Sequence, residues 1–170
     1  MHHYRPDIDG LRAVAIVPVV LFHAGAGAFS GGFVGVDVFF VISGFLITRL
    51  IRHEIDGGTF TLANFYERRI RRLFPALFAM LFAASAVAGW LLLPADLVDF
   101  AKSVAATSLF GSNFLFWGES GYFGRAAEEI PLLHTWSLAV EEQYYILFPL
   151  FLLLVAARGR KRYVMATALV

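Results

Sequence analysis

The chain contains 170 residues, of which 59% are hydrophobic and only 16% are charged. This balance is too apolar for an ordinary soluble domain of this size and predicts an integral membrane protein. The net charge of +1 gives no bulk basic field for nucleic acid, so nucleic-acid binding is excluded as the main function. The absence of cysteine excludes disulfides, thiol nucleophiles and cysteine-ligated metals.

Two apolar runs near the start of the chain, residues 11–29 and 33–51, are each close to the length that crosses a membrane. A hydrocarbon core of about 30 Å requires roughly 20 helical residues. The uncharged, glycine-rich stretch 25–32 predicts a turn, so we expect the two helices to form a hairpin. The N-terminus lacks the pattern of a cleaved signal peptide, and the first run is expected to remain in the mature chain.

The next predicted helices lie on the two sides of Pro75. Residues 62–74 place apolar side chains at roughly helical spacing among arginines, a pattern typical of a basic interfacial helix. Pro75 then begins a further span over 76–93, and Pro94 ends it. The inner part of this span is rich in small residues, which allow close contacts between helices.

The segment 96–117 is ambiguous, because polar residues interrupt its apolar periodicity, so it could cross the membrane, re-enter it or lie at the interface. These polar residues are Asp96, Asp99, Lys102, Ser103, Thr107, Ser108, Ser112 and Asn113. The following run, 138–157, is again long enough to span and precedes a basic cluster at 158–162.

The positive-inside rule decides between the two topologies. With three earlier crossings, only Lys102 and Arg125 of the 14 Lys and Arg residues lie outside, and the N-terminus is cytoplasmic. A fourth crossing would place the cluster at 158–162 outside the cell. We therefore expect the segment 96–117 to be re-entrant or interfacial.

A last apolar run, 163–170, is too short to span. The chain is thus expected to be the N-terminal part of an all-α, polytopic transmembrane helix bundle that is incomplete. It would hold about four to five membrane-associated helices of a larger bundle, and partners for its buried polar groups are expected on helices absent from it.

Two ionisable residues, Arg12 and His23, lie within the first predicted span. On a helix they are about 16 Å apart along the axis and share one face to within about 20°. A lipid-facing ionisable residue would be costly, so this face is expected to look into a protein cavity, with His23 at roughly mid-membrane depth.

Each of the two residues has a functional and a structural interpretation. His23 can serve as a base or nucleophile, or hold helices together by a hydrogen bond. Arg12 presents a planar fork that suits a carboxylate, a phosphate or a developing oxyanion, or it anchors the helix at the interface. Asp9, three residues earlier, is a candidate ion-pair partner for Arg12.

The densest charge cluster contains Arg68, Arg69, Arg71 and Arg72, and Glu67 lies four residues before Arg71, where the two can pair. The topology places this cluster on the cytoplasmic side. It would attract anionic lipid headgroups or bind the phosphates of a cytosolic donor.

Candidate carboxylates are expected towards the opposite side. Glu141 and Glu142 point about 100° apart on a helix, so they are not expected to face one cavity. One of them would bind a polar acceptor such as a sugar hydroxyl, or orient a base. Asp37, near the outer end of the second span, is expected mainly to form structural hydrogen bonds. No metal site is predicted, because no HExxH or comparable spacing surrounds His134.

Four stretches of the chain resemble the N-terminal part of the acyltransferase 3 family, membrane acyltransferases that modify bacterial surface glycans and related molecules. They are RPDIDGLRAVA at 5–15, GVDVFFVISGFLI at 35–47, RRIRRLFP at 68–75 and LHTWSLAVEEQYY at 133–145. The family's pattern of an arginine and a histidine separated by ten residues falls on Arg12 and His23. Its Arg-Arg-x-x-Arg-x-x-Pro pattern falls on Arg68, Arg69, Arg72 and Pro75.

The resemblance implies transfer of an acyl group, usually acetyl, from cytoplasmic acyl-coenzyme A to a hydroxyl of a cell-surface glycan or lipid-linked saccharide. His23 would be catalytic, Arg12 its required partner, and the arginine pattern the donor site. Acyl-coenzyme A would be a co-substrate, with no permanently bound cofactor. The resemblance also implies a multi-pass protein of the bacterial inner membrane. Further helices and an extracytoplasmic SGNH-type domain are expected elsewhere in the complete protein, so the chain alone would be inactive.

Two other functions would use the same buried charges. A transporter or flippase for a lipid-linked or anionic solute needs no covalent chemistry. A sensor or assembly protein would use His23 to read pH and the basic helix to bind lipid. Transfer of a labelled acetyl group distinguishes the enzyme from both.

Overall fold

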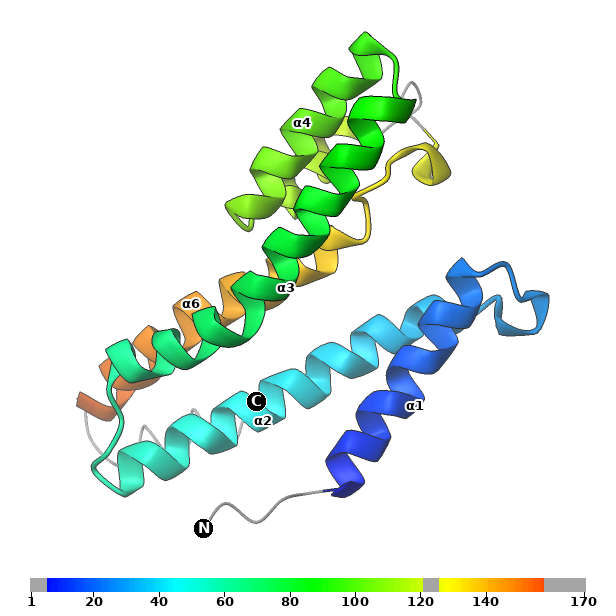
Figure 1. The fold of residues 1–170 in the computed structure, drawn as a ribbon. Helices are drawn as coiled ribbons and strands as arrows, with labels where there is room; N and C mark the ends of the chain where they lie inside the picture. Colours follow the sequence, from blue (N-terminus) through cyan, green and yellow to red (C-terminus); the bar gives the residue numbers. More distant parts are fainter. Residues whose placement is uncertain (1–5, 121–125, 158–170) are drawn as a thin grey trace. The chain divides into compact units, whose positions relative to one another are not determined.

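A computed structural model of the chain describes residues 6–120 and 126–157 (Figure 1), and throughout these ranges the regular structure is helical, which confirms the all-α class. The helices are α1 (Pro6–His23), α2 (Gly35–Asp56), α3 (Leu62–Leu91), α4 (Pro94–Ser108), α5 (Ser112–Glu119) and α6 (Thr135–Ala157), with 3₁₀ turns at Gly27–Phe29, Gly32–Val34 and Ala127–Glu129. The described residues form two compact units, one made of 6–59 and 150–157, the other of 60–120 and 126–149.

Three stretches are long and apolar enough to cross a membrane, namely Gly32–Asp56, Leu62–Leu91 and Thr135–Ala156. The chain is therefore a multi-pass membrane protein. Helix α1 is not among the three, because Asp7, Asp9 and Arg12 occupy its first half and the uncharged part that follows is only about 15 Å long. Arg5, Arg125 and the basic cluster at 158–162 lie outside the described residues, so the predicted orientation stays a prediction.

The first helix ends earlier than its predicted bounds of 11–29. Gly25 adopts a φ of 77°, a left-handed conformation that glycine tolerates at no steric cost. Its N–H donates to Phe22 O at 3.0 Å, and the N–H of Ala26 donates to Leu21 O at 3.0 Å. This pair of bonds is a Schellman motif, which closes the C-terminus of a helix. His23 is consequently the last residue of α1 and does not lie in the middle of a long span.

Helices α1 and α2 form the predicted hairpin (Figure 1). Gly32 and Gly35 allow α2 and the turn before it to pack closely against α1. A Cβ atom added to Gly35 would lie 2.1 Å from Ala15 O, and one added to Gly32 would lie 2.1 Å from Pro18 O. Both separations are far below van der Waals contact, so the backbones approach as closely as they do only because these side chains are absent.

Gly35→Ala is expected to disrupt this hairpin, because a backbone carbonyl cannot yield as a flexible side chain can. Overpacking of this kind typically costs about 1–3 kcal/mol. The expected result is a lower thermal unfolding temperature of the complete protein in detergent. Gly31→Ala is the matched control, since a Cβ there would meet no atom within 4 Å. Equal unfolding temperatures for the two variants would contradict the close approach.

Helix α3 is continuous, whereas the sequence predicts an interfacial helix over 62–74 and a separate span over 76–93. Thr61 caps its N-terminus by accepting a hydrogen bond from the backbone N–H of Asn64 at 3.2 Å. Pro75 lies inside the helix, where its missing N–H and its ring cost about 3 kcal/mol. Leu77 and Leu81, which follow it, are buried in the core, and their packing favours continuation of the helix through the proline.

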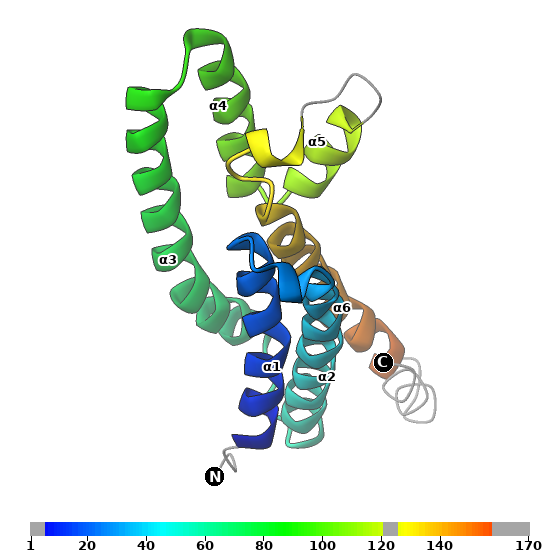
Figure 2. The same ribbon diagram turned by 90° about the vertical axis from the view of Figure 1, so that its right-hand side faces the viewer.

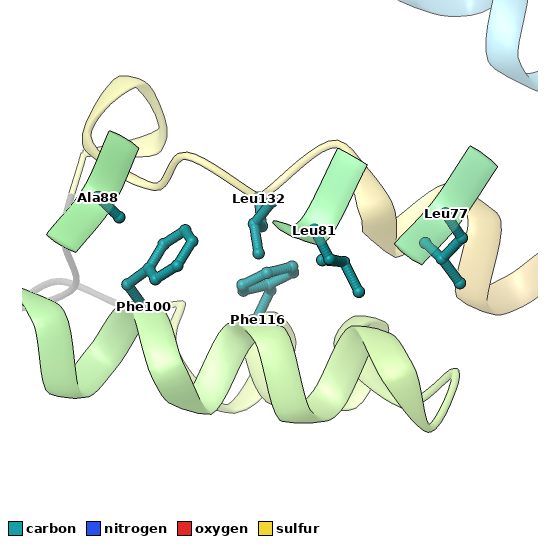
Figure 3. Packing of buried hydrophobic residues seen from close by; sticks show 6 residues of the cluster. All are labelled: Leu77, Leu81, Ala88, Phe100, Phe116 and Leu132. Atoms are coloured by element: carbon teal, nitrogen blue, oxygen red, sulfur yellow. The ribbon is translucent and has the colours of Figure 1, made fainter. Parts of the chain in front are cut away.

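Helices α4 and α5 replace the single predicted segment 96–117. After α3 the chain runs along α4 and then changes direction into α5 (Figure 2). In the turn between these two helices Phe110 has a φ of 54°. Helix α4 is about 22 Å long, which is too short to cross a bilayer. The core of this unit (Figure 3) joins α3, α4, α5 and the chain before α6, through Leu77, Leu81, Ala88, Phe100, Phe116 and Leu132.

The polar residues that interrupt the apolar pattern of 96–117 partly form a junction between the α4–α5 turn and α6. The hydroxyl oxygens of Thr107 and Thr135 are 2.9 Å apart, and Ser112 donates to Thr135 O at 2.9 Å. Gln143 donates through Nε2 to Phe110 O at 2.7 Å. Because these buried groups satisfy one another, the junction has a structural role. A re-entrant or interfacial position for this segment stays a prediction.

Candidate functional site

Arg12 lies on α1 and reaches over α2. Its Cζ atom is 5.2 Å from the centroid of the Phe39 ring, which is a cation–π contact. Its Nε is buried without a hydrogen-bond partner in the part of the chain that the structure describes. The predicted ion pair with Asp9 is absent from the same residues, because the guanidinium extends towards Phe39 while Asp9 stays exposed. A buried guanidinium nitrogen without a partner marks a place for a further acceptor.

His23 is exposed at the end of α1, not enclosed in a mid-membrane cavity by the residues described here. Its Nδ1 is 2.8 Å from Val19 O. Because a carbonyl oxygen only accepts, Nδ1 must carry the hydrogen of this bond, and in a neutral ring Nε2 is then the proton acceptor. This bond lies within α1, so it is not the hydrogen bond between helices that the structural interpretation expected.

Arg12 and His23 share one continuous helix, so their axial separation of about 16 Å holds. This is further than the two side chains reach together. A single ligand that contacts both groups must therefore be elongated.

Asp37 is the third residue of α2 and is exposed. A carboxylate in the first turn is favoured by the positive end of the helix dipole. The structural hydrogen bonds expected of it stay a prediction.

The four arginines of α3 differ in their surroundings. Arg71 pairs with Glu67 at 2.7 Å in an exposed i,i+4 ion pair, as predicted. Arg68 and Arg72 are also exposed, and as an i,i+4 pair they lie on one face of the helix. The side chain of Arg69 is only 23% exposed.

Arg69 is enclosed by residues of α3 and α6. Its Nη2 atom is 3.7 Å from Glu142 Oε1 in an ion pair. Its Cζ atom lies 3.2 Å from the centroid of the Tyr145 ring and 5.9 Å from that of Phe65. Glu141 accepts a hydrogen bond from the Tyr145 hydroxyl, so the two glutamates bind different members of this cluster.

This ion pair corrects the prediction that the arginine cluster and the glutamates lie towards opposite faces of the membrane. Arg69 and Glu142 are in contact, so their regions of α3 and α6 lie at one level. The physical reason is the position at which α6 begins. Leu132, just before the helix, is 1% exposed and packs in the core, which places the first turns of α6 inside the unit and not at its outer edge.

Tyr145 and Phe65 are members of this cluster that the sequence reasoning missed. Phe65 lies four residues before Arg69, and this spacing was the available signal. No group of three or more His, Asp and Glu residues that would hold a metal is found within residues 6–120 and 126–157.

A family model described as an acyltransferase domain matches residues 5–170. The chain is 38% identical over 162 residues to "Putative O-acetyltransferase SAS0844" of Staphylococcus aureus (strain MSSA476). The matched region covers 94% of this chain and 26% of that protein. It is also 39% identical over 168 residues to "O-acetyltransferase OatA" of Staphylococcus aureus (strain NCTC 8325 / PS 47). This match covers 96% of this chain and 27% of that protein. The chain therefore spans about a quarter of the length of these relatives. No solved structure matches it significantly.

Proposed function

The chain belongs to the acyltransferase 3 family, and from this membership we propose that the complete protein is a membrane O-acyltransferase. It transfers an acyl group, acetyl in this proposal, from cytoplasmic acyl-coenzyme A to a hydroxyl of a cell-surface glycan or lipid-linked saccharide. The protein would lie in the bacterial inner membrane with a cytoplasmic N-terminus, and further helices or an SGNH-type domain would complete it. The observation that carries the chemistry is the bond from His23 Nδ1 to Val19 O.

With Nδ1 occupied, Nε2 of the neutral ring is the basic nitrogen. It takes the proton from the acceptor hydroxyl, and the oxygen attacks the thioester carbonyl. The C–S bond then breaks, and the thiolate of coenzyme A receives the proton from the imidazolium. In the alternative route Nε2 attacks the thioester carbonyl, the C–S bond breaks and coenzyme A leaves as the thiolate. The acceptor oxygen then attacks the acylated ring, the N–C bond breaks, and the hydroxyl proton passes to the thiolate. Both routes require the same free nitrogen of His23.

Arg12 supports the reaction through charge. Its buried Nε lacks an acceptor among the described residues, and a guanidinium stabilises an oxyanion or a nearby polar oxygen of the donor. The separation of about 16 Å between Arg12 and His23 suits the long pantetheine arm of an acyl-coenzyme A. The exposed Arg68 and Arg72 would bind its phosphates, with Arg69 beside them in the same sequence pattern.

The proposal is tested by incubating membranes that carry the complete protein with acetyl-coenzyme A labelled in the acetyl group. Label is expected in a saccharide fraction, and its amount should depend on the protein and on the donor. Movement of an intact saccharide across the membrane without incorporation of label would favour a transporter. Independence from coenzyme A together with tolerance of Arg68→Lys would favour a lipid-binding sensor.

A further inference from the structure

We infer that Arg69 is a positioning residue for the donor site and not a ligand of the donor. This inference rests on the proposed function, in which Arg68 and Arg72 bind the phosphates of acyl-coenzyme A. Glu142 and Tyr145 of α6 hold the Arg69 guanidinium, and this contact fixes the first turns of α3. The fixed helix then presents Arg68 and Arg72 to the donor.

The surroundings of Arg69 leave little room for a phosphate. The Tyr145 ring covers one face of the guanidinium at 3.2 Å, and Phe65 lies nearby. The carboxylate of Glu142, whose side chain is 11% exposed, lies 3.7 Å from Arg69 Nη2. An incoming phosphate would be repelled by this carboxylate or would have to displace it. Displacement would leave a buried charge without its partner, which is strongly unfavourable.

A second contact joins the same parts of the two helices. The hydroxyl of Tyr66 donates to Ile146 O at 2.8 Å. Tyr66 pairs with a residue later in α6 than the partner of Arg69, so α3 and α6 run antiparallel at this point. Because Tyr66 and Arg69 are three residues apart, they lie on one face of α3. That face is occupied by α6.

Arg68 and Arg72 are distinguished from Arg69 by their exposure. They lie about 40° apart around the axis, and Arg69 is about 100° from Arg68 and about 60° from Arg72. Both outer residues are exposed. A rotation or shift of α3 against α6 would move both of these side chains together. The ion pair of Arg69 thus affects donor binding by setting the positions of Arg68 and Arg72.

Glu142→Gln in the complete protein gives the sharpest test, because the two roles of Arg69 predict opposite changes. If Arg69 positions α3, loss of the carboxylate raises the KM for acetyl-coenzyme A by about tenfold, equivalent to about 1.4 kcal/mol, with little change in kcat or in the KM for the acceptor. If Arg69 binds the donor, Glu142→Gln releases the guanidinium, and the KM stays the same or falls. An unchanged or lower KM would overturn the inference.

Arg69→Ala completes a double-mutant cycle with Glu142→Gln. Positioning predicts that each single variant raises the donor KM and that the double variant is no worse than the more severe single one, since both remove the same contact. Independent, additive effects would also overturn the inference. Glu67→Gln is the matched control on the exposed ion pair of α3, and it is expected to change the donor KM by less than about twofold.

Thermal unfolding without donor separates this inference from the proposed function. The positioning contact predicts a lower unfolding temperature for both single variants, with coupled effects in the double variant, even if the wild-type protein transfers no acetyl group. Wild-type unfolding temperatures for both single variants would show that the contact does not hold α3 in place and would overturn the inference. If the alanine variant does not accumulate, Arg69→Lys and Glu142→Gln supply the same comparison with smaller changes.

Discussion

His23→Ala in the complete protein is expected to lower the rate of acyl transfer by about 10²–10⁴-fold, the usual contribution of a general base. The variant removes Nε2, the nitrogen that both proposed routes require, while leaving the backbone of α1 intact. The Schellman motif that ends the helix uses backbone groups of Leu21 and Phe22, so the fold of the hairpin should persist. Initial rates with labelled acetyl-coenzyme A, normalised to the amount of protein in the membrane, measure the loss.

His53→Ala is the matched control for this experiment. His53, like His23, lies in the last turn of a helix and is exposed. Its replacement should leave the rate within about twofold, as expected of a surface substitution. If His23→Ala retains the wild-type rate, catalysis lies elsewhere in the complete protein. If it lowers accumulation and the rate in proportion, the bond to Val19 O has only a structural role.

The sequence pattern predicted the helical class and the hairpin because apolar periodicity and the glycine-rich turn carry this information locally. It placed the end of α1 incorrectly, since residues 24–29 are uncharged and extend an apolar run although Gly25 closes the helix. At Pro75 the sequence predicted a helix boundary where the helix continues. The local cost of the proline favours a break, but the tertiary packing of the buried Leu77 and Leu81 outweighs that cost.

The candidate site shows the same limit of local information. Charge counting places Arg69 correctly in a basic segment, but it does not identify the partner of an individual arginine. That partner, Glu142, is 73 residues later and is reached only because Leu132 draws the start of α6 into the core. Similarly, Asp9 is the nearest carboxylate to Arg12 in the sequence, whereas the guanidinium contacts Phe39 on the neighbouring helix.

Arg12→Lys in the complete protein is expected to lower acyl transfer by about 10–100-fold, although it preserves the positive charge. Lysine lacks the planar fork and the Nε donor of arginine, and its compact ammonium group is a poorer partner for the Phe39 ring. In the structure Arg12 Nε is buried without an acceptor among the described residues. If that nitrogen donates to an oxygen of the donor or to the developing oxyanion, its loss weakens stabilisation of the transition state.

The rate at saturating and at low acetyl-coenzyme A distinguishes the possible roles of Arg12. A fall in kcat indicates stabilisation of the transition state, whereas a higher KM at unchanged kcat indicates binding of the donor before reaction. Arg49→Lys, at an exposed position on α2, is the control and should leave both constants within about twofold. Full activity of Arg12→Lys would mean that positive charge alone suffices. The residue would then be an interface anchor, and its contact with Phe39 would serve to hold α1 against α2.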